Sequence, residues 1–309
     1  MSMLTDTAAP GRQSLTRLTF DRFLEHRMAL ASGALLIVLT LAALAAPMVV
    51  AWLGLDPEDV DLLARYEPAS AAHPLGTDEL GRDVLARLLY GGRVSLLVGL
   101  ATAIIAAVIG TAVGLVAGYY GGWVDALLMR LTDTVIALPI LPLLIVLAAI
   151  DLGKLGLPPN IATSPDISLY RIIIIIALVG WTTVARLVRG AALSLRERDF
   201  VLAAQSQGAG GVWIMLRHIL PNAISPIIVA TTLSVGNIIL LESVLSFLGL
   251  GIQPPIASWG NMLNNAQELI YEAPMLAVWP GLAIFATVIA FNFLGDGLQD
   301  ALDPKAIRR

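Results

Sequence analysis

Long apolar runs separated by short polar segments dominate the chain. Six runs predict helices that cross a membrane: Met28–Leu53, Arg93–Gly118, Thr134–Ile150, Ile172–Val188, Ala223–Leu250 and Pro274–Leu294. A helix needs about 20 apolar residues to cross a hydrocarbon core of about 30 Å. The isoleucine run 172–176 favours a strand, but a lone strand in lipid leaves its backbone groups unpaired, so we expect a helix. The pattern predicts an all-α integral membrane protein.

Composition supports this class and excludes several others. Of 309 residues, 57% are hydrophobic and 14% are charged, whereas a soluble domain has about 45–50% and about 25%. The net charge of −4 and the scattered basic residues predict no binding to nucleic acid. The sequence has no cysteine, and its three histidines, His26, His73 and His218, lie far apart. This excludes disulfides and thiolate chemistry and argues against a histidine-built metal site.

The basic residues predict how the spans are oriented. If the N-terminus is cytoplasmic, the inner segments carry most of the Lys and Arg residues outside the spans, as the positive-inside rule requires. We therefore expect a cytoplasmic segment 1–27, a transmembrane domain 28–298 and a cytoplasmic tail 299–309. Within that domain, the loop 54–92 lies outside and the loop 190–222 inside. The first span exceeds the about 7–15 apolar residues of a signal peptide, so we expect a retained anchor.

Two segments outside the spans have patterns of their own. Ser14–Arg27 is either an amphipathic helix on the inner leaflet or a basic tail that sets the orientation. In the outer loop, Thr77 or Asp78 can cap a helix that stops at Gly91 and Gly92. Its apolar stripe suits the outer interface or a lid over the spans, and it indicates no chemistry.

Small residues and prolines predict how two of the spans pack. Gly110, Gly114 and Gly118 form small-xxx-small steps, which let two helices approach closely. Packing within the chain is the favoured interpretation, and a contact between two copies is the alternative. Pro139 and Pro142 should bend the third span, because each removes a backbone donor.

The inner loop 190–222 is the most informative segment. It is long for a bundle, where connections often have about 2–8 residues. Asp199–Gly208 predicts a short helix, with Asp199 as its cap or as a charge favourable to its dipole, and Gly208 ends it with a positive φ. A second helix, Val212–Leu220, leads through Pro221 into the fifth span. Held at both ends by spans, the first helix is either a lever that moves them or an interfacial helix without a partner.

If the chain pumps a solute, the energy must come from another chain or from an ion gradient. The glycines of the inner loop follow no strand and precede no Lys-Ser or Lys-Thr, so they form no phosphate-binding loop. The sequence also lacks the nucleophile elbow and the zinc-protease motif, which argues against an intramembrane enzyme.

The inner loop resembles the coupling motif of permeases from binding-protein-dependent ATP-binding-cassette importers. That motif reads Glu-Ala-Ala, three residues, Gly, nine residues, Ile-x-Leu-Pro. Leu202 replaces the Glu and His218 replaces the Ile, while Asp199 supplies the slightly earlier acidic residue frequent in the peptide branch. The matching residues are Ala203, Ala204, Gly208, Leu220 and Pro221.

Other segments resemble the dipeptide, oligopeptide and nickel branch of this family. Together they cover the chain from about residue 15 to its end, and the chain is most similar to the second, C-type permease of the pair. The segments are His73–Asp83, Gly118–Gly122 with Asp125 and Arg130, Leu245–Gly251, Gln253–Pro255, Trp259–Gly260 and Phe291–Pro304.

The resemblance implies a type I importer permease with six spans, both termini inside and a cytoplasmic coupling helix, in the bacterial inner membrane. Its expected partners are a second permease, two ATPase subunits that bind ATP and Mg, and an external solute-binding protein. The chain itself would hold no cofactor and would move small peptides inward by alternating access. The expected ATPase-coupling residues are Asp199, Phe200, Ala203, Ala204, Gly208, Leu220 and Pro221.

Three questions stay open at the level of sequence. The same family imports nickel and oligosaccharides, so these are alternative solutes. A gradient-driven secondary transporter is an alternative of another class, but Glu242 alone lies deep in a span and no inverted repeat is visible. Asn237 and Glu242 either line the translocation path, or Glu242 bonds a neighbouring helix and holds the bundle together.

Overall fold

The computed structural model describes residues 15–302 apart from 155, 157, 159, 161–163 and 265–270, so Ser14 and the tail 303–309 lie outside it. Described residues form helices and loops, with one isolated bridge between Thr77 and Asp83. The helices are α1 (Leu15–Glu25), α2 (Arg27–Leu44), α3 (Ala46–Leu53), α4 (Val84–Tyr120), α5 (Gly122–Ala137), α6 (Ile140–Ala148), α8 (Pro165–Leu195), α9 (Asp199–Ser206), α10 (Gly211–Ile214), α11 (Leu220–Phe247) and α13 (Met275–Leu302), with a π turn η1 (Met215–Ile219) and a 3-10 turn η2 (Asn261–Leu263).

The predicted spans are present as helices. Five helical stretches of the described chain are long and apolar enough to cross a membrane, and a sixth span results if α5 and α6 count as one bent span. The fifth predicted span is longer than expected, because α10, the π turn and α11 form one continuous run, Gly211–Phe247. The amphipathic N-terminal pattern forms helix α1, as one of its two interpretations required.

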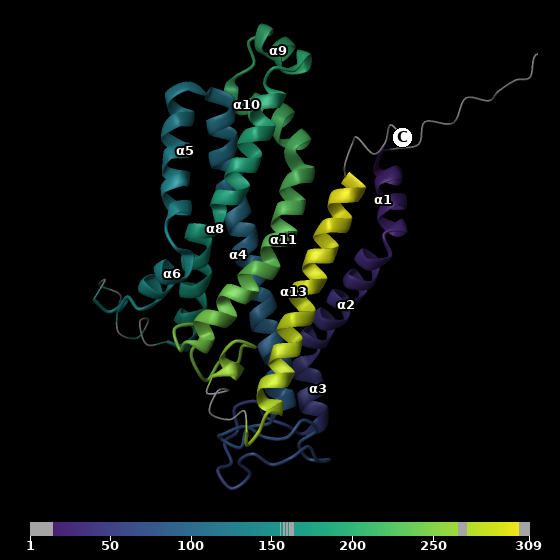
Figure 1. Ribbon diagram of the computed structural model, residues 1–309, viewed down its shortest axis with the longest axis vertical. Helices are drawn as coiled ribbons and strands as arrows, with labels where there is room; N and C mark the ends of the chain where they lie inside the picture. Colours follow the sequence, from purple (N-terminus) through teal and green to yellow (C-terminus); the bar gives the residue numbers. More distant parts are fainter. Residues whose placement is uncertain are drawn as a thin grey trace, which may run out of the picture.

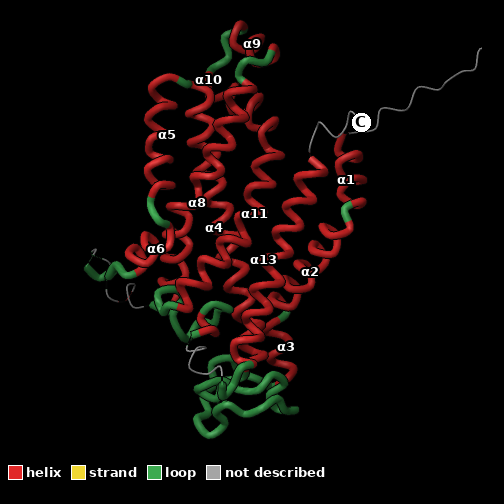
Figure 2. Tube along the Cα trace, in the orientation of Figure 1, coloured by secondary structure: helices red, strands yellow, loops and turns green. Residues whose placement is uncertain are grey.

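The long helices run roughly along the long axis of the molecule, whereas the short helix α6 lies across it (Figure 1). Helix α9 lies at one end, with α1 and the C-terminal end of α13 toward the same end. The loop between α3 and α4 lies at the opposite end, where most of the loop structure gathers (Figure 2). This arrangement agrees with the charge pattern, and the assignment of the α9 end to the cytoplasm stays a prediction.

Helices α4 and α8 pack in close contact through three glycines. A Cβ on Gly110 would lie 2.5 Å from the carbonyl oxygen of Trp181, and one on Gly114 would lie 2.6 Å from that of Ala185. A Cβ on Gly118 would lie 2.6 Å from the Cβ of Ala192. The expected packing within the chain is therefore confirmed.

The predicted outer helix is wrong at both ends. Helix α4 begins at Val84, and its cap is Asp83, whose carboxylate accepts a hydrogen bond from the Ala86 backbone N–H at 2.7 Å. It does not stop at Gly91 and Gly92 but continues to Tyr120, so residues 84–92 form one continuous helix with the second predicted span. These two glycines provide room for Ser258 and Trp259, 3.1 Å and 3.0 Å from their ideal Cβ positions.

The third span starts earlier than the predicted Thr134–Ile150 and is bent, as its prolines predicted. Helix α5 already begins at Gly122, and its axis makes an angle of 87° with that of α6. The break falls at Leu138 and Pro139, so the predicted bend is confirmed for Pro139, which cannot donate a backbone hydrogen bond.

The glycine contact predicts a selective loss of stability. Gly114→Ala should destabilise the fold by about 1–3 kcal/mol, because the new methyl group overlaps the α8 backbone. Gly190→Ala is the matched control, since a Cβ there meets no atom within 4 Å. Thermal unfolding of the purified chain in detergent measures both, and equal stability of the two variants would contradict the packing.

Candidate functional site

Helix α9 is anchored on its own chain by one face and exposes the other. Val201 is fully buried and Ala204 is 9% exposed, and both pack in a cluster with Ile214, Met215 and Ile219. The opposite face exposes the side chains of Phe200, Leu202 and Ala203. Of the two alanines in the predicted motif, Ala203 is therefore open to a partner, whereas Ala204 holds the helix in place.

Both ends of α9 show how the sequence sets its length. Arg198 occupies the N-cap position without a side-chain cap, so Asp199 acts through its charge in the first turn, the second of the two predicted roles. Gly208 has a φ of 81°, as predicted. The Gly208 and Ala209 N–H groups donate to the carbonyls of Gln205 and Ala204 at 2.9 and 3.1 Å. These two bonds form a Schellman motif, which ends a helix where a glycine adopts positive φ.

An open hollow of about 520 Å³ lies beside α9. Its aromatic residues cluster, with the Trp213 and His218 ring centroids 4.9 Å apart and Phe200 and His218 6.1 Å apart. Trp213 was not identified from the sequence, although an exposed tryptophan on a helix outside the predicted spans is a usable signal. The hollow is lined by Phe200, Ala203, Ala204, Gln207, Gly208, Ala209, Trp213 and His218.

Leu220 and Pro221 lie apart from this surface. They form the first turn of α11, directly after the π turn that ends at Ile219. Pro221 has no backbone N–H to donate, and it follows the π turn, where the α-helical hydrogen-bond pattern is already interrupted. Their place indicates that they shape the entry into the fifth span, while α9 and the hollow form the exposed surface.

The turn between α4 and α5 connects this loop to the spans. Gly211 lies against it, since a Cβ there would be 2.9 Å from the Tyr119 ring and 3.2 Å from the Tyr120 hydroxyl. Arg196 donates to the Gly118 carbonyl at 3.1 Å. Two turns earlier, on α8, Arg189 pairs with Asp125 through two hydrogen bonds, one of 2.6 Å. The turn between α4 and α5 thus contacts both ends of the segment that contains α9, at Arg196 before α9 and at Gly211 after it.

Glu242 is the centre of a buried polar network in the half of the molecule distant from α9. Its carboxylate accepts hydrogen bonds from Ser246 at 2.7 Å, Ser258 at 2.9 Å and Ser95 at 3.4 Å. Ser95 in turn accepts from the Trp259 backbone N–H at 3.1 Å. The network joins α4, α11 and the loop before α13.

Glu242 and Asn237, the two residues predicted for the translocation path, differ in their surroundings. Glu242 is 0% exposed and lines no open surface, so its contacts match the alternative in which it holds the bundle together. Asn237 is exposed on another side of α11. A place for Asn237 on the path stays a prediction.

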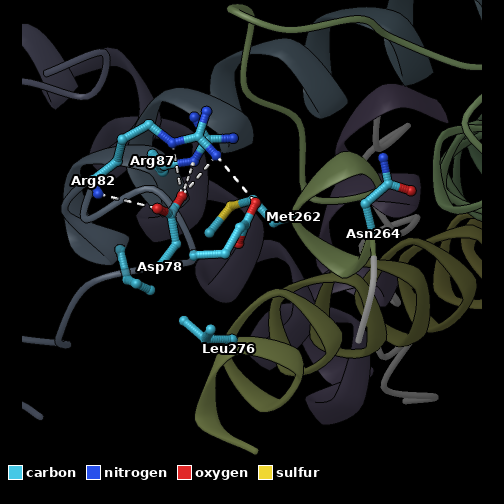
Figure 3. A pocket seen from close by; sticks show the side chains of 8 residues that line it. Asp78, Arg82, Arg87, Met262, Asn264 and Leu276 are labelled. Carbon is cyan, nitrogen blue, oxygen red and sulfur yellow. Dashed lines mark hydrogen bonds and ion pairs between the residues drawn. The ribbon is translucent and has the colours of Figure 1, made fainter. Parts of the chain in front are cut away.

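A charged cluster connects the loop between α3 and α4 to the start of α4 (Figure 3). Asp78 pairs with Arg82 at 2.8 Å and with Arg87 at 3.4 Å, and Arg82 also reaches Glu79 at 3.3 Å. Asp83 accepts from His73 at 3.0 Å while it caps α4. These contacts bind the outer loop to the start of α4. Within the described residues, no three His, Asp or Glu side chains gather as metal ligands.

The Glu242 network predicts energetic coupling between its members. Glu242→Ala and Ser258→Ala should each destabilise the fold, and together they should cost less than the sum by about 0.5–3 kcal/mol, because both remove the same hydrogen bond. Unfolding of the single and double variants measures this. Additive losses would show that the two side chains do not interact.

Two models of known protein families match different parts of this chain. Residues 110–308 match the family model of the binding-protein-dependent transport system inner membrane component. Residues 14–69 match that of the N-terminal transmembrane domain of oligopeptide transport permease C.

Individual relatives cover nearly the whole chain. A protein of Brucella suis named as a peptide permease is 42% identical over 93% of this chain and 90% of its own length. The glutathione transport system permease protein GsiD of Pectobacterium atrosepticum is 41% identical over 92% and 89%. GsiD of Escherichia coli is 42% identical over 92% and 88%. The chain therefore belongs to the inner membrane permeases of binding-protein-dependent ATP-binding-cassette importers, in their peptide, oligopeptide and nickel branch.

Proposed function

We propose that this permease imports small peptides and that ATPase subunits drive it through helix α9. The observation that carries the proposal is the division of α9 into a buried face with Ala204 and an exposed face with Ala203. A short helix that packs against its own chain with one face can transmit a displacement that a partner imposes on its other face. Family membership supports the partners: a second permease, two ATPases that bind ATP and Mg, and an external solute-binding protein.

The contacts of the loop 190–222 suggest how a displacement of α9 would reach the spans. Helix α9 packs on Ile214 and Ile219, which lie on the helical run that becomes α11. Its other end continues into α8, whose Arg189 and Arg196 hold the α4–α5 turn. A displacement of α9 would therefore move α8 and α11 together, and closure of the ATPases would convert an inward-open path into an outward-open one.

The names of the relatives support peptides as the solute. Relatives are named for peptides and for glutathione, itself a small peptide. Glutathione is thus the second candidate solute, while nickel and oligosaccharides stay alternatives within the branch. The external binding protein would select among them.

The exposed face of α9 provides the test of coupling. Ala203→Arg should lower solute uptake by about tenfold or more, equivalent to about 1.4 kcal/mol of lost coupling, because the larger side chain separates α9 from the ATPase. Gly208→Val should have a similar effect, since valine disfavours a φ of 81°. Uptake and ATPase co-purification are measured in one reconstituted importer.

Two further variants control this experiment. Ala126→Arg adds the same side chain to an exposed alanine on α5, one turn before Arg130, and should transport normally. Ala204→Arg would displace α9 from its own chain, so it reports on folding rather than docking. Normal uptake by Ala203→Arg and Gly208→Val with ATPases attached would refute α9 as the coupling element.

Topology is tested by reporter fusions. Fusions near Ala72 and Asn264 should report an external location, and a fusion near Gly210 an internal one, because Gly210 lies next to α9 at the opposite end from the outer loop. An external signal at Gly210 would place the coupling surface on the wrong side of the membrane.

A further inference from the structure

Helices α2 and α4 leave an apolar groove between them in the half of the molecule distant from α9. Its volume is about 390 Å³, and most of its lining area is hydrocarbon. The groove extends over about one turn of α2 and over residues 90–100 of α4. The stretch of α4 is about 15 Å long at 1.5 Å per residue. The lining residues are Thr40, Ala43, Leu44, Tyr90, Arg93, Val94, Leu96, Leu97 and Leu100.

One charged side chain lies on the rim of this groove. The Arg93 guanidinium carbon is 5.7 Å from the centroid of the Tyr90 ring. Arg93 is exposed, and in the described part of the chain no carboxylate forms an ion pair with it. The groove therefore combines a long apolar wall with one cation that has no anionic partner in this chain.

The length of α4 places this cation at the surface of the bilayer. Helix α4 has 37 residues, which is about 55 Å, far more than a hydrocarbon core of about 30 Å. Its first residues pack against the outer segments, up to Gly92 beside Trp259. The following stretch 94–118 contains no charged residue, so the core begins just past Arg93. Trp52, 84% exposed near the end of α3, fits the aromatic belt of the same interface.

We propose that this groove binds a glycerophospholipid of the outer leaflet, with its phosphate on Arg93 and one acyl chain between α2 and α4. A guanidinium forms paired, charge-assisted hydrogen bonds with phosphate, and Tyr90 restricts the orientation of the arginine. Because lipid tails are as apolar as the groove, selectivity comes from the headgroup contact, and the chain contributes close packing.

A helix of a second permease fits the groove less well than an acyl chain. A helix about 10 Å in diameter occupies about 1,200 Å³ over a length of 15 Å, so only part of its surface would seat in an open groove of about 390 Å³. An extended acyl chain is a few Å wide. The proposal depends on membrane insertion and on the predicted orientation of the chain, but not on the coupling role of α9.

The test measures phospholipid on the purified full-length chain. After delipidation in mild detergent, phosphatidylglycerol is added and bound lipid is counted by native mass spectrometry. Arg93→Gln should lower binding about tenfold, because a charge-assisted bond is lost. Leu97→Trp should also lower it, since its exposed side chain would fill the groove. Arg65→Gln is the matched control, because Arg65 also lies over a tyrosine, 5.5 Å from the Tyr66 centroid, but outside the groove.

Three outcomes would overturn the proposal. The first is unchanged lipid binding by Arg93→Gln and Leu97→Trp. The second is equal binding of glycerol phosphate, which would show a phosphate site without an acyl chain. The third concerns the assembled importer in native membranes, where a photoactivatable phospholipid should label residues 90–100. Absence of this label, with cross-linking of Leu97 to the second permease instead, would show that protein covers the groove.

Discussion

The close contact between α4 and α8 is the interaction on which the rest of the structure depends. In lipid, apolar side chains gain little by leaving the solvent, so helices associate where their backbones can approach and pack. Gly110, Gly114 and Gly118 allow that approach in the half of α4 nearer to α9. As a result, the C-terminal end of α8 meets the α4–α5 turn, and the segment that follows α8 starts from a fixed point. The position of α9 thus depends on the packing of α4 against α8 as well as on its own contacts with Ile214 and Ile219.

The two halves of the molecule use polar contacts in different ways. Toward α9, Arg189 with Asp125 and Arg196 with the Gly118 carbonyl tie α8 to the turn at which α5 begins. At the opposite end, Glu242 with its serines and Asp78 with its arginines hold the loops 250–264 and 54–83 against the spans. Polar contacts therefore connect the elements within each half. Between the two halves, the chain bends by 87° from α5 to α6. The alternating access proposed above would need such linked ends, because both would have to move as units.

Much of this fold could be predicted from the sequence, for physical reasons that are local. Apolar runs, positive φ at Gly208 and the small-residue spacing of α4 each follow from the requirements of lipid or of the backbone. The start of α4 could not be predicted, because Gly91 and Gly92 read as a stop until Trp259, distant in sequence, occupies the space beside them. The same holds for Glu242, whose partners come from three segments. Motif spacing also could not show that Ala203 faces outward and Ala204 inward, since this depends on where Ile214 and Ile219 lie.

The claim that α9 contacts the ATPase subunits can be tested by disulfide cross-linking. The chain has no cysteine of its own, so Ala203→Cys and Ala204→Cys introduce single thiols into an otherwise silent background. Each is combined with single cysteines along the surface of the ATPase subunit in the intact importer, and cross-linked product is measured after mild oxidation. The exposed position of Ala203 predicts strong cross-linking there and little from the buried Ala204. Failure of Ala203→Cys to cross-link at any ATPase position, in an importer that transports normally, would contradict the account.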